Sequence, residues 1–307
     1  MTNGARLLET SRSFLILGPT AAGKSDFAVA VAEHCDGEIV SADAFQIYAG
    51  LDLLTAKPAA ELRARVPHHL VGEVPLTESW DVARWLEAAR LRLAEIQARG
   101  RVAIVVGGTG LYVRALTRGL ADLPPASPAL RAELESQPPA ELQRRLAELD
   151  PESARHIDLR NPRRVIRALE VCLLTGRPFS SFREQWSATP SGWRGIVLIC
   201  DRAELSERID RRTEAMFAAG VVEEVRAAGE IGATAAQTLG LREIRAHLAG
   251  ELTKGECIAA IQQATRRYAK RQRTWFRREI DFRTVNLSPL TDVPALAAEI
   301  AGEARSS

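Results

Sequence analysis

The 307-residue sequence predicts an α/β fold with a parallel sheet, interrupted by an inserted all-helical domain. The segments Phe14–Leu17 and Arg101–Val106 are continuously apolar, as is typical of strands buried on both faces of a parallel sheet. Glycine-containing loops and helical patterns follow these segments, and such alternation is typical of α/β folds. From Pro128 to about Leu174 the alternation stops, and a composition dominated by Glu, Arg, Leu and Ala indicates helices alone.

The positions of the strands and helices are predicted from the spacing of apolar residues and from the turn residues between them. Strands are expected at Phe14–Leu17, Glu38–Val40, Arg101–Val106, Gly195–Cys200 and Arg283–Leu287, and helices at Asp26–His34, Trp80–Arg99 and Glu204–Phe217. We therefore place the core at residues 1–120 and 196–307 and the helical insertion at residues 121–195. The insertion opens with the proline-rich segment Leu123–Pro128, which is typical of a linker.

Composition excludes several classes of protein. Apolar residues make up 46% of the chain and charged residues 26%, which allows a core of ordinary size. No run of eighteen apolar residues occurs, so we expect no membrane span, and the polar stretch Met1–Ser13 does not resemble a signal peptide. The four cysteines lie far apart without zinc or redox spacing, which indicates reduced thiols and a cytoplasmic location: Cys35, Cys172, Cys200 and Cys257.

A phosphate-binding motif follows the first strand. Its residues match G-x-x-x-x-G-K-[ST] between a predicted strand and a predicted helix: Gly18, Pro19, Thr20, Ala21, Ala22, Gly23, Lys24 and Ser25. The glycines allow backbone N–H groups to turn toward phosphate oxygens, and the helix start adds its positive end. Lys24 supplies a charge, and Ser25 is a candidate Mg²⁺ ligand. The motif predicts a P-loop NTPase-like core that binds a phosphate compound.

The motif does not identify that compound. No guanine-reading N-K-x-D sequence occurs, and the strand ending at Val106 continues into Gly107–Gly110 instead of into an acidic residue. The strand Glu38–Val40 leads to Asp43. Because the carboxyl ends of parallel strands share one edge, we expect Lys24, Asp43 and Thr109 around one cleft. From its position alone, Asp43 is a metal ligand, a general base or a turn residue, and Thr109 is a site hydroxyl or a turn residue.

The segment Arg266–Arg278 holds seven basic residues and no acidic one. Such a run is either a solvated helix face or a surface for a polyphosphate or RNA backbone, and its place in a phosphate-binding chain favours the second interpretation. Tyr268 and Trp275 lie on a separate helical stripe, and we interpret both as core anchors. His68 and His69 point in different directions if extended, which favours a structural or substrate-side role over a metal site.

Several longer segments extend the pattern from residue 14 to about residue 280. They are SADAFQIY at Ser41–Tyr48, TAKP at Thr55–Pro58, PHHL at Pro67–Leu70, VGGTGLY at Val106–Tyr112, RVIRALEV at Arg164–Val171, TGRP at Thr175–Pro178 and TRRYAKRQRTWF at Thr265–Phe276. Together with Gly18–Ser25, and in this order, they resemble the tRNA dimethylallyltransferase family. The resemblance implies transfer of a prenyl group from dimethylallyl diphosphate to N6 of adenosine 37, beside the anticodon of tRNA.

The resemblance also implies roles for particular residues. Asp43 matches the general base and Thr109 a residue that positions the reacting atoms, while Lys24 and Arg212 match groups that neutralise the leaving diphosphate. The matching tRNA-contacting positions are Asp43, Ala44, Phe45, Gln46, Thr109, Arg131, Arg163, Arg164, Val165, Ile166 and Arg167. The implied cofactor is Mg²⁺ at Ser25. We expect the insertion to contact the anticodon stem-loop, and we expect a monomer.

Three positions depart from the family pattern. Ala44 stands where a serine is usual, Leu54 where a glycine is usual, and Leu241 where a tyrosine is frequent. The first two put details of tRNA contact in doubt and leave the reaction unaffected.

Three other functions compete with tRNA prenylation. A small-molecule P-loop kinase explains the phosphate loop but explains neither Arg266–Arg278 nor the helical insertion. An isopentenyltransferase acting on free AMP needs no insertion for tRNA. A non-catalytic RNA-binding protein would not need Lys24, Asp43 and Thr109 together. An assay offering unmodified tRNA, AMP and ATP in parallel separates these alternatives.

Overall fold

A computed structural model describes residues 12–182, 192–287 and 291–306. Its centre is a six-stranded sheet in the order β3-β2-β4-β1-β5-β6, with every pairing parallel. The strands are β1 Ser13–Leu17, β2 Gly37–Ala42, β3 His68–His69, β4 Val102–Gly107, β5 Arg194–Ile199 and β6 Arg283–Asn286. The predicted α/β class with a parallel sheet is confirmed.

The phosphate loop follows the strand at the middle of this sheet. β1 pairs with β4 on one side and with β5 on the other, so that Leu17 lies beside Gly107 and beside Val197. All five residues of β1 and all six of β4 are buried. This central position explains their unbroken hydrophobicity, because both faces of each strand are covered.

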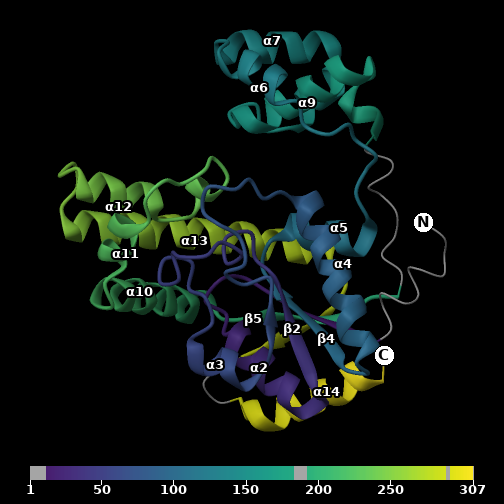
Figure 1. Ribbon diagram of the computed structural model, residues 1–307, viewed down its shortest axis with the longest axis vertical. Helices are drawn as coiled ribbons and strands as arrows, with labels where there is room; N and C mark the ends of the chain where they lie inside the picture. The colour runs from purple at the N-terminus through teal and green to yellow at the C-terminus, as the bar shows by residue number, and fades with distance from the viewer. Residues whose placement is uncertain (1–11, 183–191, 288–290, 307) are drawn as a thin grey trace. The chain divides into compact units, whose positions relative to one another are not determined.

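Two helices pack together on one face of the sheet. Helix α2, Lys24–Cys35, lies beside α14, Val293–Arg305, in Figure 1. Their side chains form one apolar cluster with the strands, which includes Phe27 from α2, Ile300 from α14 and Ile16 from β1. This cluster anchors α2, and therefore also fixes the loop that precedes it.

Helix α4, Val82–Ala98, packs against β2 and β4 outside that cluster. Its fully buried Trp85 donates a hydrogen bond from Nε1 to the carbonyl oxygen of Ser41 at 2.9 Å and stacks on Tyr112, with ring centroids 4.4 Å apart. The indole therefore supports the end of β2, immediately before Asp43.

The other helices of the core are α3 Ala60–Arg65, α5 Gly110–Arg118, α10 Arg202–Ala218, α11 Val221–Ala227, α12 Leu241–Leu248 and α13 Lys254–Glu279. The long α13 packs against α10 and α12, whereas α3 packs against α2. Two of the departures from the family pattern, Leu54 and Leu241, are buried in one apolar cluster with Ile261 of α13. They are packing residues, and they fill the same region of the core.

The chain separates into two compact units, residues 1–116 with 192–307, and residues 117–191. The described helices of the second unit are α6 Pro128–Glu135, α7 Pro139–Leu149, α8 Pro151–His156 and α9 Pro162–Thr175, followed by the 3₁₀ turn Phe179–Phe182. This unit has its own core, which includes Leu134, Leu146 and Leu169.

The unit boundaries differ by a few residues from the predicted insertion of residues 121–195. Ala121 is buried with Val171 and Phe182, and Leu123 packs against them. The start of the proline-rich segment that we expected to be a linker is thus part of the helical unit. At the other end, Arg194 and Gly195 already belong to β5. Most of the predicted loop Pro178–Gly192 lies outside the described residues.

Two short elements near residue 65 were not predicted. Helix α3 spans six residues and β3 only two, which is too short for a hydrophobic period to be recognised. His69 in β3 places Nε2 at 2.7 Å from Oε2 of Glu38, and Nδ1 of His68 lies 2.7 Å from the carbonyl oxygen of Val66. Both contacts agree with the structural role expected for the two histidines. None of the described helices is long and apolar enough to cross a membrane.

Candidate phosphate-binding site

The loop Gly18–Ser25 connects β1 to α2 and has the backbone conformation of an anion cradle. Gly18, Ala21 and Gly23 all have positive φ, at 149°, 63° and 84°. A Cβ on Gly18 would lie 2.5 Å from the carbonyl oxygen of Leu198, so only glycine fits there. Helix α2 begins at Lys24, and its first N–H groups have no intrahelical acceptor. The loop therefore offers the N–H groups and the helix end that favour a phosphate.

Lys24 lies within this loop. Its Nζ donates a hydrogen bond to the carbonyl oxygen of Pro19 at 2.7 Å. Burial lowers the pKa of Lys24 to about 8; the nearby charge of Asp43 raises this pKa, and that of Arg212 lowers it. The lysine is therefore a poorly solvated cation whose charge is only partly balanced by the protein.

Arg212 reaches the same loop from α10. Its Nη2 donates to Oγ1 of Thr20 at 3.0 Å, and its Nε is buried without a hydrogen-bond partner in the described part of the chain. Burial lowers the pKa of Arg212, and the charge of Asp43 opposes this effect. Two partly buried cations thus lie at the loop with Asp43 as the counter-charge, and the buried Nε of Arg212 is left as a donor for a further acceptor.

Asp43 stands at the carboxyl end of β2. Its Oδ1 accepts hydrogen bonds from the backbone N–H groups of Phe45 at 2.9 Å and of Gln46 at 3.3 Å. This is the Asx turn that we considered from the sequence, and it holds the carboxylate in one orientation. The turn does not exclude a chemical role, because the charge of Asp43 also acts on Lys24 and Arg212.

Thr109 joins the loop after β4 to the Asp43 loop. Its Oγ1 accepts the N–H of Ala44 at 3.1 Å, and its own N–H donates to the carbonyl oxygen of Ala42 at 3.3 Å. The structure therefore brings Lys24, Arg212, Asp43 and Thr109 to the carboxyl edge of the central strands.

Helix α13 adds two residues that the sequence did not identify as part of the site. Burial and the nearby charge of Asp43 raise the pKa of the Tyr268 hydroxyl, so this side chain lies near the site and is more than a core anchor. Gln272, one turn further along, hydrogen-bonds with Thr20 and with Gly108. The sequence offered one signal for these two residues: Tyr268 and Gln272 are four apart and therefore lie on the same face of the helix. Polar side chains on a buried helix face need hydrogen-bond partners.

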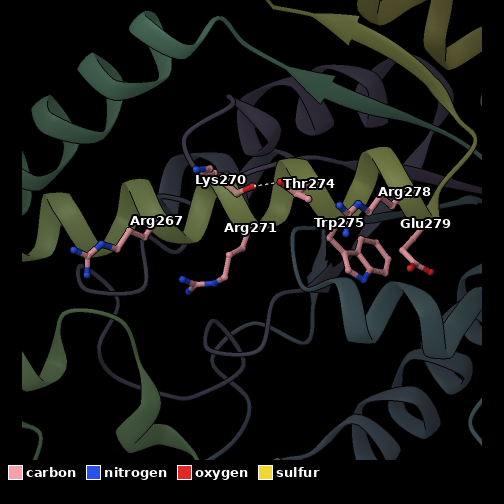
Figure 2. Close-up of a pocket in the computed structure, with 7 residues that line it drawn as sticks. All are labelled: Arg267, Lys270, Arg271, Thr274, Trp275, Arg278 and Glu279. Atoms are coloured by element: carbon pink, nitrogen blue, oxygen red, sulfur yellow. Dashed lines mark hydrogen bonds between the residues drawn. The ribbon is translucent and has the colours of Figure 1, made fainter. Parts of the chain in front are cut away.

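The basic residues of α13 border two hollows. The first has a volume of about 560 Å³ and is lined by Arg267, Lys270, Arg271, Thr274, Trp275, Arg278 and Glu279. Figure 2 shows Arg267, Arg271 and Trp275 pointing to one side of the helix and Lys270 to the other. The second is a groove of about 1200 Å³ over β5 and β6, and its cations include Arg266, Lys270, Arg273 and Arg277.

The predicted tRNA-contacting residues of the helical unit fall into three groups. Arg131 and Arg167 both bind the fully buried Glu170, at 3.0 Å and 2.5 Å, and Glu170 also accepts the N–H of Ser127 at 2.7 Å. Arg163 and Arg164 are exposed at the start of α9. The last two members, Val165 and Ile166, are buried in the unit's own core. Their side chains pack within the unit, and contact of these two positions with tRNA stays a prediction.

The candidate Mg²⁺ position was tested against the donor atoms present. In the described residues, no group of three His, Cys, Asp or Glu side chains gathers as a metal site. Ser25 is the second residue of α2, and its hydroxyl group forms no hydrogen bond within the described ranges. A site with one serine oxygen suits Mg²⁺, which keeps several waters and takes its other ligands from substrate phosphates.

The fold and the site define an α/β protein with a lysine-containing phosphate loop, a second partly buried cation and a carboxylate at one sheet edge. The chain belongs to the IPP transferase family, whose model matches residues 46–279; a second model, described as isopentenyl transferase, matches residues 11–66.

Similar proteins extend this assignment over almost the whole chain. A tRNA dimethylallyltransferase of Akkermansia muciniphila is 44% identical over 291 residues, covering 95% of this chain and 99% of that protein. One from Anaeromyxobacter dehalogenans is 45% identical over 298 residues, covering 94% and 99%.

Solved structures agree with the sequence matches. The tRNA isopentenylpyrophosphate transferase of Bacillus halodurans has a TM-score of 0.69 at 34% identity, covering 96% of this chain and 97% of that one. A eukaryotic dimethylallyltransferase acting on tRNA has a TM-score of 0.79 at 25% identity, covering 95% and 78%.

Proposed function

We propose that this chain transfers a dimethylallyl group from dimethylallyl diphosphate to N6 of adenosine 37 in tRNA and releases diphosphate. Its relatives named tRNA dimethylallyltransferase are about 45% identical over most of the chain. The observation that carries the proposal is the pair of partly buried cations, Lys24 and Arg212, that bond to a phosphate loop beside Asp43. The kinase alternative explains the loop but provides no use for the basic helix or for the family membership.

The diphosphate of the donor is the anion that this cradle fits. The two partly buried cations repel each other, and the loss of water around each charge is unfavourable unless the charge is paired. A diphosphate would bring several negative charges to Lys24, to the unpartnered Nε of Arg212 and to the N–H groups at the start of α2. These groups would bind the developing charge of the leaving diphosphate more strongly than the charge of the bound donor, which accelerates transfer.

The transfer breaks one bond and forms one. The C1–O bond of the donor breaks, its electron pair leaves with the diphosphate, and a C1–N6 bond forms to adenine. N6 then loses a proton, and we assign Asp43 to accept it. The Asx turn holds the carboxylate, and the hydrogen bond from Ala44 to Thr109 ties the turn to the loop after β4. Thr109 therefore positions the acceptor side of the reaction.

The adenine must leave the stack of the anticodon loop to reach the buried donor carbon, so a flipped base is part of the proposal. The exposed cations of α13 and the exposed Arg163 and Arg164 of α9 would bind the RNA backbone. Arg131 would contribute to tRNA binding mainly by its ion pair with Glu170, which stabilises the helical unit. We propose that the chain acts as a monomer in the cytoplasm, where its four buried free thiols stay reduced.

Mg²⁺ is part of the proposal through Ser25. A bound Mg²⁺ would neutralise phosphate charge during bond cleavage. Ser25 would supply one oxygen ligand from the first turn of α2, and the donor phosphates and water would supply the others.

The function is tested by incubating the protein with labelled dimethylallyl diphosphate and, in parallel, unmodified tRNA, AMP or ATP. We expect label on tRNA at adenosine 37. Label on AMP alone would indicate the free-nucleotide enzyme, and phosphoryl transfer from ATP would indicate the kinase.

Asp43→Asn tests the proton acceptor within the same assay. We expect transfer to fall by roughly 100- to 10,000-fold, because the amide cannot accept the proton, while tRNA affinity measured by filter binding stays within about twofold. Asp281→Asn, at an exposed position, is the matched control and should retain full activity. A fully active Asp43→Asn enzyme would remove Asp43 from this role.

A further inference from the structure

A buried glutamine of α13 connects the two loops that carry the proposed chemistry. Gln272 is 6% exposed, and both ends of its side-chain amide are bonded. Its Oε1 accepts the backbone N–H of Thr20 at 2.8 Å, and its Nε2 donates to the carbonyl oxygen of Gly108 at 2.9 Å. One side chain therefore links the phosphate loop after β1 to the loop after β4, where Thr109 is the next residue.

The surroundings of the amide leave little freedom. A Cβ added to Gly108 would collide with Nε2 of Gln272 and would lie 3.0 Å from the carbonyl oxygen of Gly18. The glutamine amide is thus packed closely against Gly108. Without its amide, the partly buried N–H of Thr20 and the carbonyl group of Gly108 would each lack this partner, and the two loops could separate.

The linked residues are those on which the proposed transfer depends. The hydroxyl of Thr20 accepts a hydrogen bond from Arg212, and Thr109 accepts one from the Asp43 loop through Ala44. Thr20 therefore lies on the diphosphate side of the proposed site, and Gly108 lies on its acceptor side. Their separation sets the distance between the donor carbon and the attacking nitrogen.

We infer that Gln272 is a positioning residue for prenyl transfer, which holds the diphosphate cradle in register with Asp43 and Thr109. This inference rests on the proposed function. Gln272 takes no part in bond breaking, and its effect lies in the alignment of two groups held by different loops. A misalignment of about 1 Å at a reacting centre can reduce a rate roughly 100-fold, so loss of the link should be visible in turnover.

Two variants at this position separate positioning from simple stability. Gln272→Met keeps the length of the side chain and removes both hydrogen bonds. We expect kcat to fall by roughly 10- to 100-fold, with tRNA affinity within about twofold of the wild type. Gln272→Glu keeps the acceptor for Thr20, but its ionised carboxylate repels the carbonyl oxygen of Gly108. Protonation turns the same group into a donor, so the ratio of Gln272→Glu activity to wild-type activity should rise as the pH falls from neutral.

The controls use a second glutamine of the same helix. Gln263→Met and Gln263→Glu make the same chemical changes at an exposed position of α13 and should keep wild-type kcat with a flat pH ratio. If Gln272→Met does not fold, the pH profile of Gln272→Glu gives the same comparison. Wild-type kcat in both Gln272 variants, or a Gln272→Glu ratio that is independent of pH, would overturn the inference.

An independent measurement distinguishes this failure from failure of the proposed function. Inorganic diphosphate should raise the Tm of the wild-type chain, and the rise should be smaller in Gln272→Met because Thr20 is no longer held. An equal rise in both proteins would contradict the link even if the wild-type chain prenylated no tRNA. If the wild type transfers the prenyl group and the Gln272 variants transfer it at the same rate, the proposed function is retained and the inference about Gln272 is rejected.

Discussion

The charged residues of the site are placed at a cost to the stability of the empty protein. Lys24 and Arg212 are partly buried near each other, and Asp43 is the acid whose charge acts on both. A chain selected only for stability would not keep two desolvated cations together, because each burial opposes ionisation. Perturbed groups of this kind in one cleft are characteristic of functional sites.

The pH dependence of diphosphate binding follows from Lys24. Burial lowers the pKa of Lys24 from 10.5 to about 8, so the lysine loses its charge as pH rises through about 8. Affinity for inorganic diphosphate should therefore fall above that pH, by at most roughly tenfold per pH unit, as measured by calorimetry.

The stability of the ligand-free chain should change in the opposite direction. The unfolded chain holds more protons on Lys24 between about pH 8 and 10.5, so folding gains stability across this window. Lys24→Met should remove both effects, raise the Tm of the ligand-free protein by ~2–4 °C, and abolish diphosphate binding. A lower Tm in this variant would show that Lys24 stabilises the empty fold.

Site residues could be predicted from the sequence where they belong to a contiguous motif. The phosphate loop is contiguous, and its residues were read directly from the sequence. Arg212 lies 188 positions after Lys24 and was assigned only through the family resemblance. Tyr268 and Gln272 were missed in their present role, because burial of a polar side chain against a particular loop is a property of the packing and not of the helix period.

At the scale of elements, α9 shows how one helix divides its charges between structure and surface. Arg167 and Glu170 interact along the helix, and Arg131 of α6 reaches the same carboxylate. Burial alone would raise the pKa of Glu170, but the hydrogen bonds from Arg131, Arg167 and Ser127 outweigh it and leave the pKa lowered. Arg164, three residues before Arg167, stays exposed.

Two alanine variants should therefore behave differently. Arg164→Ala should weaken tRNA binding and reduce the slope of log K against log salt by about one, with unchanged unfolding. Arg131→Ala should destabilise the helical unit by about 1–3 kcal/mol, because Glu170 loses one of its donors. Salt-dependent binding and urea denaturation of both proteins make the comparison. A loss of stability in Arg164→Ala with unchanged tRNA binding would contradict the assignment of Arg164 to the binding surface.

The long strands and helices were predicted to within one or two residues because their hydrophobic periods are long enough to recognise. Strand Phe14–Leu17 became Ser13–Leu17, and helix Trp80–Arg99 became Val82–Ala98. The two-residue β3 has no period, and only its pairing with β2 makes it a strand. Sequence alone could not show that pairing, since it depends on contacts between distant segments.

At the scale of the whole molecule, the two units have separate cores. The buried residues of the helical unit include Leu134, Leu146 and Leu169, and none of these belongs to the cluster beneath the sheet. The sequence predicted this division from the loss of strand–helix alternation. The bounds could not be read from composition, because the proline-rich segment packs on the helices through Leu123.

A cavity in one core should therefore have a local effect. Leu169→Ala should destabilise the helical unit by about 2–5 kcal/mol, and hydrogen exchange should accelerate in residues 117–182 but not in β1 or β4. The matched control is Leu174→Ala on the same helix, where the side chain is 45% exposed and the change should stay within about 0.5 kcal/mol. Faster exchange throughout the sheet would show that the units unfold together.

The arrangement of strand lengths in the sheet has a consequence for solubility. The two outermost strands are also the shortest, with two residues in β3 and four in β6. The latter carries Arg283, which forms ion pairs with Glu299 and Glu303. An open strand edge is a template on which a neighbouring chain can add its own backbone. These borders present few unpaired amides and a charged side chain, which protects an otherwise extendable sheet from aggregation.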